Sequence, residues 1–466
     1  MADTKAAKYD AIILGSGQGG KPLAVELAGA GWNVALIEAK HLGGTCVNEG
    51  CTPTKTMVAS ARVAHLVHRA EDYGVKTGAV TVDLAVVRDR KRSIVETFRG
   101  GSEKLVEKTD NLDLYMGTGR FVSPHEIDVE LNAGGTARLY GEKIVINTGA
   151  RPSKPPIDGI EDVETLDSTS IMELDAVPRH LVVIGGSYIG LEFGQMFRRF
   201  GAQVTIIEYG PQLIVREDED VAEAVKEIMQ DDGIAVMLNA SANRVERHSN
   251  GTVELSVEQE GMETTVSASH LLLAAGRTPN TDDIGIDKVG VELDKRGHIV
   301  VDDRLGTNVD HVFAIGDVKG GPAFTHISYD DFRILKSGFL GDGSRSIADR
   351  PVPYTMFIDP QLAKVGLSEK EAKQQGRKYT VARIPMTSVA RALETDETRG
   401  LMKALIDPDT DQIIGCTILG IEGGEIMAVL QTAMMGGLPY TAIRDGVYAH
   451  PTLAESLNNL FARVEK

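Results

Sequence analysis

Short apolar runs closed by turns alternate with longer amphipathic stretches in the first part of the chain. Residues 11–14 form a run typical of a buried strand, and a glycine-rich turn and a helical stretch to residue 30 follow it. Residues 34–37 predict a second strand. Residues 52–73 then predict a long helix, and residues 82–107 predict one or two more. The order of strand, turn, helix and strand is that of an α/β fold.

The rest of the chain is richer in strands. Residues 112–149 alternate between apolar and polar positions and contain turn signals, so they predict a β-meander that returns to the first sheet at residues 144–148. A cluster of prolines at residues 152–156 marks a boundary, and residues 234–273 predict further strands. Beyond about residue 351 we expect a separate domain of strands followed by helices, with the strands at residues 354–366, 380–386, 401–406 and 412–420.

The opening unit recurs 170 positions later in the sequence. Chance or packing glycines would not preserve so many positions in one register, so the chain is predicted to contain two Rossmann-like units. The matched positions are Gly15, Gly20, Gly31, Val34, Ile37 and Glu38 in the first copy, and Gly185, Gly190, Gly201, Val204, Ile207 and Glu208 in the second.

The spacing of the glycines in the first copy is that of a dinucleotide-binding turn. Gly15 permits the tight turn, Gly17 lets the backbone approach a pyrophosphate, and Gly20 lets the helix pack on the strand. Glu38 ends the second strand, where a carboxylate accepts hydrogen bonds from ribose hydroxyls. In the second copy Ser187 stands in the place of Gly17 and restricts the approach to a pyrophosphate. We therefore expect the second ligand to exchange more readily.

Size and charge exclude several classes of protein. A chain of 466 residues predicts two to four domains. A net charge of −18 argues against a nucleic-acid or anionic-membrane partner, because either would need a positive face. The polar residues 1–10 lead directly into a strand, and no later run approaches about 18 apolar residues. With only three cysteines the chain is no secreted disulfide scaffold, so we expect a soluble, cytoplasmic protein.

Two of the three cysteines, Cys46 and Cys51, are separated by four residues and lie between two predicted helical segments. Such a pair can close to a disulfide, open to a dithiol and pass electrons onward. The alternatives are half of a metal site or two buried small residues, and Cys416 alone cannot complete a four-ligand zinc set. His65 and His68 have no third type of ligand nearby and are expected to be surface or packing residues. No metal site is predicted.

Three other groups of polar residues need an interpretation, and no function is favoured for the first of them. Residues 216–220 form a charge run that predicts the solvated start of a helix continuing to residue 230. Asp317 follows a predicted strand, where it either caps the next helix or meets a ligand hydroxyl. A lone histidine beside a proline is more often structural, but Glu455 and the thiol pair favour His450 as a base, because thiol exchange benefits from one.

Together these features resemble the flavoprotein disulfide reductase family, the group of dihydrolipoamide dehydrogenase and glutathione reductase, over essentially the whole chain. The resemblance implies an α/β fold with two Rossmann-like nucleotide-binding domains and a C-terminal α+β dimerisation domain, and hence a homodimer. The implied parts are an FAD-binding domain at residues 1–150 and 277–347, an NAD(P)-binding domain at residues 151–276, and the dimerisation domain at residues 348–466.

The resemblance also implies roles for individual residues. Cys46 would be the thiol that meets the substrate, and Cys51 the thiol that touches the flavin. Lys55 and Glu192 would form an ion pair near the flavin N5, and Tyr188 would gate the nicotinamide pocket. His450 would act as a base on the other subunit's thiols, with Glu455 fixing its tautomer. The implied cofactor-binding residues are Gly15, Gly17, Gly20, Glu38, Gly44, Thr45, Thr148, Gly149, Asp317, Gly185, Tyr188, Gly190, Glu208, Gly276 and Arg277.

The implied function is that of an FAD-dependent NAD(P)H:disulfide oxidoreductase. NADH is expected rather than NADPH, which stays possible, because Glu208 would repel a 2′-phosphate. Residues 51–56 and 455–461 are closer to the mercuric-reductase-like and copper-reducing branch, so the alternative is a metal-ion (Hg or Cu) or quinone reductase. Against mercuric reductase itself, the chain lacks the N-terminal Cys-x-x-Cys domain and the C-terminal cysteine pair, and it keeps His450 where that enzyme has a tyrosine. A docking subunit of a dehydrogenase complex is a third hypothesis.

Glu49 and Thr52 stand where the better-known members carry apolar residues. Glu49 should disfavour formation of a thiolate if it faces the sulfurs. The acceptor of the electrons is therefore the least determined part of the prediction.

Overall fold

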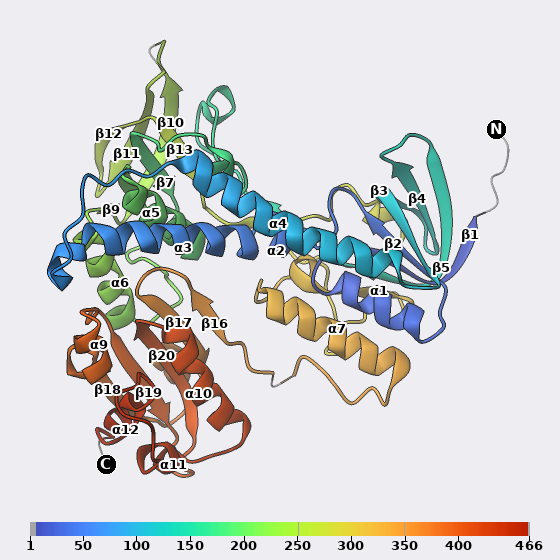
Figure 1. Cartoon of the computed structure of the whole chain (residues 1–466). Helices are drawn as coiled ribbons and strands as arrows, with labels where there is room; N and C mark the ends of the chain where they lie inside the picture. The colour runs from blue at the N-terminus through green and yellow to red at the C-terminus, as the bar shows by residue number, and fades with distance from the viewer. Residues whose placement is uncertain (1–5, 250, 349, 465–466) are drawn as a thin grey trace. The chain divides into compact units, whose positions relative to one another are not determined.

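The computed structural model describes residues 6–249, 251–348 and 350–464 and shows a mixed α/β protein (Figure 1). The chain divides into two compact units. The first consists of Met1–Thr56, Arg88–Ser153 and Gly276–Arg350, and the second of Met57–Val87, Lys154–Ala275 and Pro351–Lys466. The finer division into FAD-binding, NAD(P)-binding and dimerisation domains stays a prediction.

The first unit is built on a six-stranded sheet. β1 pairs in parallel with β2 and β5, and β15 extends the parallel part beyond β5. β3, β4 and β5 form the predicted antiparallel meander, which returns beside β1. The strands are β1 (Ala7–Leu14), β2 (Val34–Glu38), β3 (Leu112–Ser123), β4 (Glu126–Leu131), β5 (Thr136–Ile146) and β15 (Val312–Ala314).

At β1 both faces of this sheet are buried, which explains the continuous apolar run in that strand. Ile12 and Leu14 pack into one core, while Ala11 and Ile13 pack into another on the opposite face. Helices α1 (Gly20–Gly29) and α7 (Thr325–Leu340) lie in contact with each other in this unit (Figure 1). A short antiparallel pair, β6 (Ala150–Pro152) with β14 (Arg277–Pro279), follows β5 in the unit.

Three helices follow β2 along the chain: α2 (Gly44–Asn48), α3 (Cys51–His68) and α4 (Leu84–Glu107). The structure shows residues 84–107 as one helix of 24 residues, although the sequence pattern left open one helix or two. Both α3 and α4 begin in one unit and end in the other.

The second unit contains a parallel sheet in the order β13-β7-β8-β9 and an antiparallel sheet in the order β10-β11-β12. The run β7–α5–β8 repeats β1–α1–β2, as the sequence repeat predicted. The elements are β7 (His180–Ile184), α5 (Tyr188–Phe200), β8 (Gln203–Ile207), α6 (Glu219–Asp231), β9 (Ala235–Met237), β10 (Ala240–Arg247), β11 (Val253–Gln259), β12 (Met262–Ala268) and β13 (His270–Leu273).

The C-terminal part of the second unit is a five-stranded antiparallel sheet in the order β16-β17-β20-β19-β18. Helix α10 packs on β17 and β20 (Figure 1). Its elements are β16 (Tyr354–Met356), β17 (Gln361–Gly366), α8 (Glu369–Gln374), β18 (Thr380–Pro385), α9 (Ala390–Glu394), β19 (Leu401–Ile406), β20 (Ile413–Gly420), α10 (Gly423–Met435), α11 (Tyr440–Arg444) and α12 (Ser456–Phe461). Among the described helices, none is both long and apolar enough to cross a membrane.

The charge run at residues 216–220 is only partly what its pattern predicted. Helix α6 does follow it, but the prediction of a solvated face is wrong, because Glu217 and Asp218 are buried. Lys403, which is 1% exposed, donates hydrogen bonds to Asp218 at 2.7 Å, Asp220 at 2.9 Å and Glu369 at 3.0 Å. Buried carboxylates need such a partner. The partner is 185 residues from Asp218 along the chain, where a local pattern cannot show it.

Candidate active site

The first glycine-rich turn can be formed only by glycines at its two ends. Gly15 has a φ of +101°, and a Cβ there would lie 2.3 Å from the backbone oxygen of Asn147. A Cβ on Gly20 would lie 2.1 Å from the Gly15 oxygen. The Asn147 side chain fastens the turn from beneath: it accepts a hydrogen bond from Gly20 N at 2.8 Å and donates one to the Ile315 oxygen at 2.9 Å. The turn is thereby locked to the sheet.

Glu38 is held in place at the end of β2. One carboxylate oxygen accepts hydrogen bonds from Ser16 N at 3.0 Å and Ser16 Oγ at 2.6 Å, and the other accepts one from Lys40 N at 2.8 Å. These bonds orient the carboxylate beside the glycine-rich turn. Its role as an acceptor for ribose hydroxyls stays a prediction.

Helix α2, which contains Cys46, is seated directly on this turn. A Cβ on Gly44 would lie 2.6 Å from Gly17 Cα, so the two backbones are in close contact. Gln18 Nε2 donates to the Gly43 oxygen at 3.0 Å, and Gly43 N donates to Ser16 Oγ at 3.1 Å. Residues 44 and 45, both predicted to bind the cofactor, thus begin the helix that lies against the turn.

Cys46 and Cys51 are brought together as free thiols. Cys46 is half-buried in α2, and Cys51 is exposed at the start of α3. A hydrogen bond to Cys51 and burial raise the pKa of the Cys46 thiol, while Thr325 and the Lys55 ammonium oppose that rise. Cys46 therefore holds its proton more tightly than an ordinary thiol. Two thiols that share a hydrogen bond form an arrangement that can close to a disulfide.

Thr325 is a residue of this site that the sequence did not reveal. Its hydroxyl oxygen lies 3.1 Å from the sulfur of Cys51, and it is the first residue of α7. A threonine at a helix start is so common that nothing in the sequence singled it out. Only the packing of the unit brings it to a sulfur 274 residues away in the chain.

Asp317 lies within a 3-10 turn (Gly316–Lys319) that follows β15, and it does not cap that turn, whose N-cap is Ile315. Burial raises the pKa of its carboxyl, and the nearby Arg277 opposes this. Arg277 Nε lies 4.0 Å from the carboxylate, and it is buried without a hydrogen-bond partner among the described residues. A buried donor of this kind and a desolvated carboxyl fit a polar ligand such as the ribityl and phosphate groups of FAD.

Thr148 and Gly149, also predicted to bind the cofactor, are hydrogen-bonded to the segment that follows Gly276. Thr148 Oγ1 donates to the Asn280 oxygen at 2.8 Å, and Asn280 Nδ2 donates to the Thr148 oxygen at 2.8 Å. Gly149 and Gly276 both have a positive φ, of +70° and +127°, which favours glycine. The structure thus places all of these residues in the first unit, with the glycine-rich turn and the thiols.

The second glycine-rich turn has the same construction as the first. Gly185 has a φ of +115°, and a Cβ on Gly190 would lie 2.0 Å from the Gly185 oxygen. Glu208 accepts hydrogen bonds from Gly186 N at 2.6 Å and Gly210 N at 2.7 Å. Tyr188, half-buried, is the first residue of α5. These residues fit the phosphates and ribose of a nucleotide in the second unit.

Two predicted pairs have different outcomes. His450 Nδ1 lies 2.8 Å from Glu455, and the His450 side chain is 69% exposed, so this pair is present and faces solvent. Glu192 is buried in α5 and accepts a hydrogen bond from Phe357 N at 2.8 Å, whereas Lys55 belongs to the other unit. The ion pair of Lys55 with Glu192 stays a prediction, as does the approach of His450 to the thiols.

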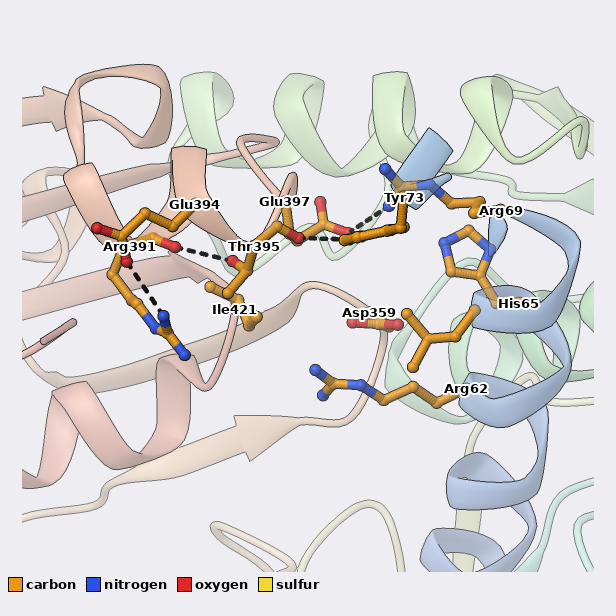
Figure 2. A pocket seen from close by; sticks show the side chains of 11 residues that line it. Arg62, His65, Arg69, Tyr73, Asp359, Arg391, Glu394, Thr395, Glu397 and Ile421 are labelled. Carbon is orange, nitrogen blue, oxygen red and sulfur yellow. Dashed lines mark hydrogen bonds and ion pairs between the residues drawn. The ribbon is translucent and has the colours of Figure 1, made fainter. Parts of the chain in front are cut away.

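His65 lines a cavity of about 350 Å³ in the second unit (Figure 2). Its Nε2 is buried without a hydrogen-bond partner among the described residues, and burial lowers its pKa to about 4. His68 differs, because its Nδ1 lies 2.7 Å from the Ala64 oxygen of the same helix. Guanidinium and carboxylate groups of both signs surround the cavity, from Arg62, Arg69, Arg391, Asp359, Glu394 and Glu397.

Comparison with known proteins identifies the family. Residues 9–331 match the model of the pyridine nucleotide-disulphide oxidoreductases, and residues 352–461 match the dimerisation domain of the same family. The chain belongs to this family. The predicted resemblance, the α/β fold class and the assignment as an oxidoreductase are thereby confirmed. The family implies FAD and a pyridine nucleotide as cofactors, and the dimerisation domain indicates a homodimer.

The similar proteins cover nearly the whole chain. A probable pyridine nucleotide-disulfide oxidoreductase, RclA of Escherichia coli, is 39% identical over 98% of this chain and 100% of its own. A dihydrolipoyl dehydrogenase of Geobacillus stearothermophilus is 33% identical over 97% and 95%, and a mercuric reductase of Bacillus cereus is 33% identical over 96% and 70%. The solved HOCl-induced flavoprotein disulfide reductase RclA has a TM-score of 0.88, with 38% identity over 98% and 100%.

Proposed function

We propose that this enzyme passes an electron pair from NADH, by way of FAD, to the Cys46–Cys51 pair and on to an oxidised disulfide. The observation that carries the proposal is the contact of the two thiols, of which Cys46 lies in the helix that packs on the first glycine-rich turn. FAD, when bound at that turn, supplies the two-electron chemistry that links a pyridine nucleotide to the thiols. Gly15, Gly17, Gly20 and Glu38 would hold it.

The two thiols have separate tasks in this proposal. The Cys46 thiolate attacks one sulfur of the acceptor, which forms a mixed disulfide and releases the first product as a thiolate that takes up a proton. Cys51 then attacks the Cys46 sulfur, which closes the internal disulfide and releases the second product thiol. Thr325, 3.1 Å from the Cys51 sulfur, can hydrogen-bond its thiolate between these steps. The balance is NADH, a proton and a disulfide in, and NAD⁺ and two thiols out.

His450 would protonate the first leaving thiolate across the subunit interface of the homodimer. Its contact with Glu455 at 2.8 Å holds the ring through Nδ1, which would leave Nε2 for the proton transfer. Mixing Cys46→Ser and His450→Ala subunits during refolding should restore roughly a quarter of the wild-type activity, because random pairing rebuilds one intact site in half of the dimers. No recovery in folded mixed dimers would place the base on the same chain as the thiols.

We propose NADH rather than NADPH as the donor. Glu208 accepts backbone hydrogen bonds on both oxygens, which hold its carboxylate in place, and the charge of that carboxylate would repel a 2′-phosphate. Arg216, the nearest cation after it in sequence, is exposed and lies in the loop between β8 and α6. We also propose a cytoplasmic location, because a reducing compartment keeps thiols reduced, and a cysteine pair there is more often catalytic than structural.

A metal-ion reductase is the second candidate. A mercuric reductase is among the similar proteins, and one solved structure of RclA is a Cu(II) complex with a TM-score of 0.90. Two adjacent thiols are suitable ligands for such soft cations. In this alternative the metal ion is the substrate and takes the electrons while held by Cys46 and Cys51.

The decisive experiment compares acceptors. The holoenzyme is assayed with NADH and oxidised lipoamide, glutathione disulfide, Cu(II), Hg(II) or a quinone. If the acceptor is a disulfide, His450→Ala loses about 10² to 10⁴-fold of that turnover, since general acid catalysis contributes about this much. Bleaching of the flavin band by NADH should stay fast in the same variant. If His450→Ala spares every disulfide but slows a metal ion, the metal-ion reductase replaces the disulfide reductase.

A further inference from the structure

The loop at residues 209–217, between β8 and α6, packs directly on the second glycine-rich turn. A Cβ on Gly186 would lie 2.6 Å from Leu213 Cδ2, so the turn and the loop are in close contact. Ile214 N donates a hydrogen bond to the Gly186 oxygen at 2.9 Å. Gly186 N in turn donates to the Glu208 carboxylate at 2.6 Å. The loop therefore supports the residue that is predicted to meet a ribose.

The backbone of this loop is strained at Ile214. Its φ is +43°, in the left-handed region that β-branched residues rarely adopt. Its side chain is buried and packs in the core of the second unit. Such a conformation persists only where the surroundings impose it, and it is common at ligand-binding sites. The loop is thus held in a shape that its own residues do not favour.

Glu217 ends the loop and anchors it to the C-terminal sheet. Its backbone N donates to the Ile214 oxygen at 2.8 Å, and Gln212 Nε2 donates to the Glu217 oxygen at 3.1 Å. Glu217 is 3% exposed, and its Oε1 accepts a hydrogen bond from the hydroxyl of Tyr354 in β16. Its Oε2 is buried without a hydrogen-bond partner among the described residues. A buried carboxyl with an unpartnered oxygen costs stability, and a functional role would explain its presence.

We propose that Glu217 is a positioning residue for the pyridine nucleotide: held by Tyr354, it fixes the loop against the second glycine-rich turn and so keeps the Glu208 carboxylate in place for the ribose. The inference deepens the proposed function and rests on it, because it takes the second turn as the site of NADH. Backbone hydrogen bonds lead from Glu217 to Ile214 and from there to Gly186, whose N–H holds Glu208. A carboxylate that is already oriented loses little freedom when the nucleotide binds.

The protonation of Glu217 gives this anchor a pH dependence. Burial raises the pKa of its carboxyl from 4.5 to about 7. The two ammonium groups that face it are paired elsewhere, Lys364 with Glu371 at 2.9 Å and Lys403 with Asp218 at 2.7 Å. The carboxyl is therefore neutral below pH 7 and becomes a buried charge above it, which should loosen the loop. The charged and titratable groups around Glu217 are Tyr354 from β16, Lys364 from β17, Glu371 from α8, Lys403 from β19 and the adjacent Asp218.

The test measures the dissociation constant of ADP-ribose for the FAD-loaded enzyme by titration calorimetry. ADP-ribose carries the adenosine ribose of NADH but accepts no electrons, so binding is measured apart from turnover. At pH 6, Glu217→Ala should raise the constant about tenfold and Tyr354→Phe about threefold, because each variant removes a partner of the hydrogen bond that anchors the loop. Equal constants for the wild type and Glu217→Ala would overturn the proposal.

Tyr379→Phe is the matched control for Tyr354→Phe. The Tyr379 hydroxyl donates to Glu369 at 3.2 Å, so this variant also removes a tyrosine–glutamate hydrogen bond in the C-terminal part of the chain. That bond does not involve the loop, and its loss should leave the dissociation constant unchanged. A rise equal to that of Tyr354→Phe would mean that the loop contact is not special, and would count against the proposal.

Two further measurements separate positioning from folding. In a Glu208→Gln background the effect of Glu217→Ala should shrink to about threefold or less, because both residues act on one contact. Full additivity would overturn the proposal. In the wild type the constant should rise about threefold from pH 6 to pH 8, whereas Glu217→Gln, which cannot ionise, should keep it near the pH 6 value. If Glu217→Ala does not retain flavin, Tyr354→Phe decides: an unchanged constant there counts against the proposal.

The outcome can be told apart from that of the proposed reaction. If binding of ADP-ribose responds to Glu217 but the enzyme reduces no disulfide with NADH, the proposed function fails while the inference stands. If disulfides are reduced and the dissociation constant does not respond to Glu217, the inference alone is wrong.

Discussion

The two glycine-rich turns of this protein share a plan but are fastened differently. In both, the acidic residue at the end of the second strand accepts backbone hydrogen bonds at the same offset of 170. Glu38 accepts hydrogen bonds from Ser16 N and Lys40 N. Glu208 accepts them from Gly186 N and Gly210 N. The sequence repeat therefore extends to the hydrogen bonds that orient each carboxylate.

The difference lies opposite the first glycine. Gly15 faces the backbone of Asn147, whose side chain ties the turn to α1 and to the end of β15, whereas Gly185 faces Ala274, which has no such side chain. Helix α2 also packs on Gly17, where the second copy has the exposed Ser187. We infer that the first turn suits a cofactor that stays bound, and the second a nucleotide that leaves after each turnover.

The largest expected effect comes from Asn147→Ala. It leaves Gly20 N and the Ile315 oxygen without their partner, and each buried unsatisfied group costs about 1–3 kcal/mol. The free energy of unfolding should fall by about 2–4 kcal/mol, with loss of flavin on gel filtration. Asn132→Ala, which removes one exposed amide contact in the same unit, should stay within about 0.5 kcal/mol in the same urea titration. Equal effects would mean that Asn147 does not lock the turn.

The segments that follow Glu38 and Glu208 also differ. The pH dependence of the free energy of unfolding tests this difference. Val47 of the first copy corresponds to Glu217 of the second, where burial raises the pKa from 4.5 to about 7. The folded state then keeps a proton that the unfolded chain releases, so stability is full below pH 4.5 and falls as the pH rises through 7. The loss should be on the order of 2 kcal/mol. Urea midpoints at pH 5 and pH 8 should converge in Glu217→Gln, and an unchanged gap would contradict the assignment.

Exchanging the residues at the second glycine position should make the nucleotide affinities of the two turns more alike. Gly17→Ser adds a Cβ 3.0 Å from Asn147 Oδ1 in a turn already covered by Gly44, so the dissociation constant of FAD should rise about tenfold, equivalent to about 1.4 kcal/mol. Ser187→Gly should lower the KM for NADH by about threefold or less with little change in kcat. Fluorescence titration of the apoprotein and steady-state kinetics measure these changes. A larger effect at Ser187 than at Gly17 would reverse our interpretation.

The smallest effect is expected at the two glutamates. Glu208→Gln removes the charge that opposes a 2′-phosphate, so the ratio of kcat/KM for NADH over NADPH should fall by about fivefold, close to 1 kcal/mol. Glu38→Gln is the matched control, because it makes the same change in the first copy and should leave that ratio unaltered. Parallel effects of the two variants would show that the ratio does not depend on the second turn.

Local sequence patterns predicted the structure correctly where nearby residues determine it. The strands at residues 11–14 and 34–37 are continuous apolar runs because both faces of a parallel sheet are covered, and the glycines repeat because a Cβ would strike backbone atoms in each turn. The same local logic failed for residues 216–220. A charge run usually marks a solvated helix start, but Lys403 arrives from a distant strand and permits burial.

The sequence by itself determined the fold class, the two Rossmann-like units, the thiol pair and the family, because each depends on residues within a few positions of one another or on a repeat at constant offset. Only the tertiary structure decided that Thr325 meets Cys51, that Asn147 holds one turn and not the other, and that the Lys21 ammonium meets Ser102. Those contacts join residues 81 to 274 positions apart. They exist because the sheets and helices pack, and no local propensity records which distant side chains that packing will bring together.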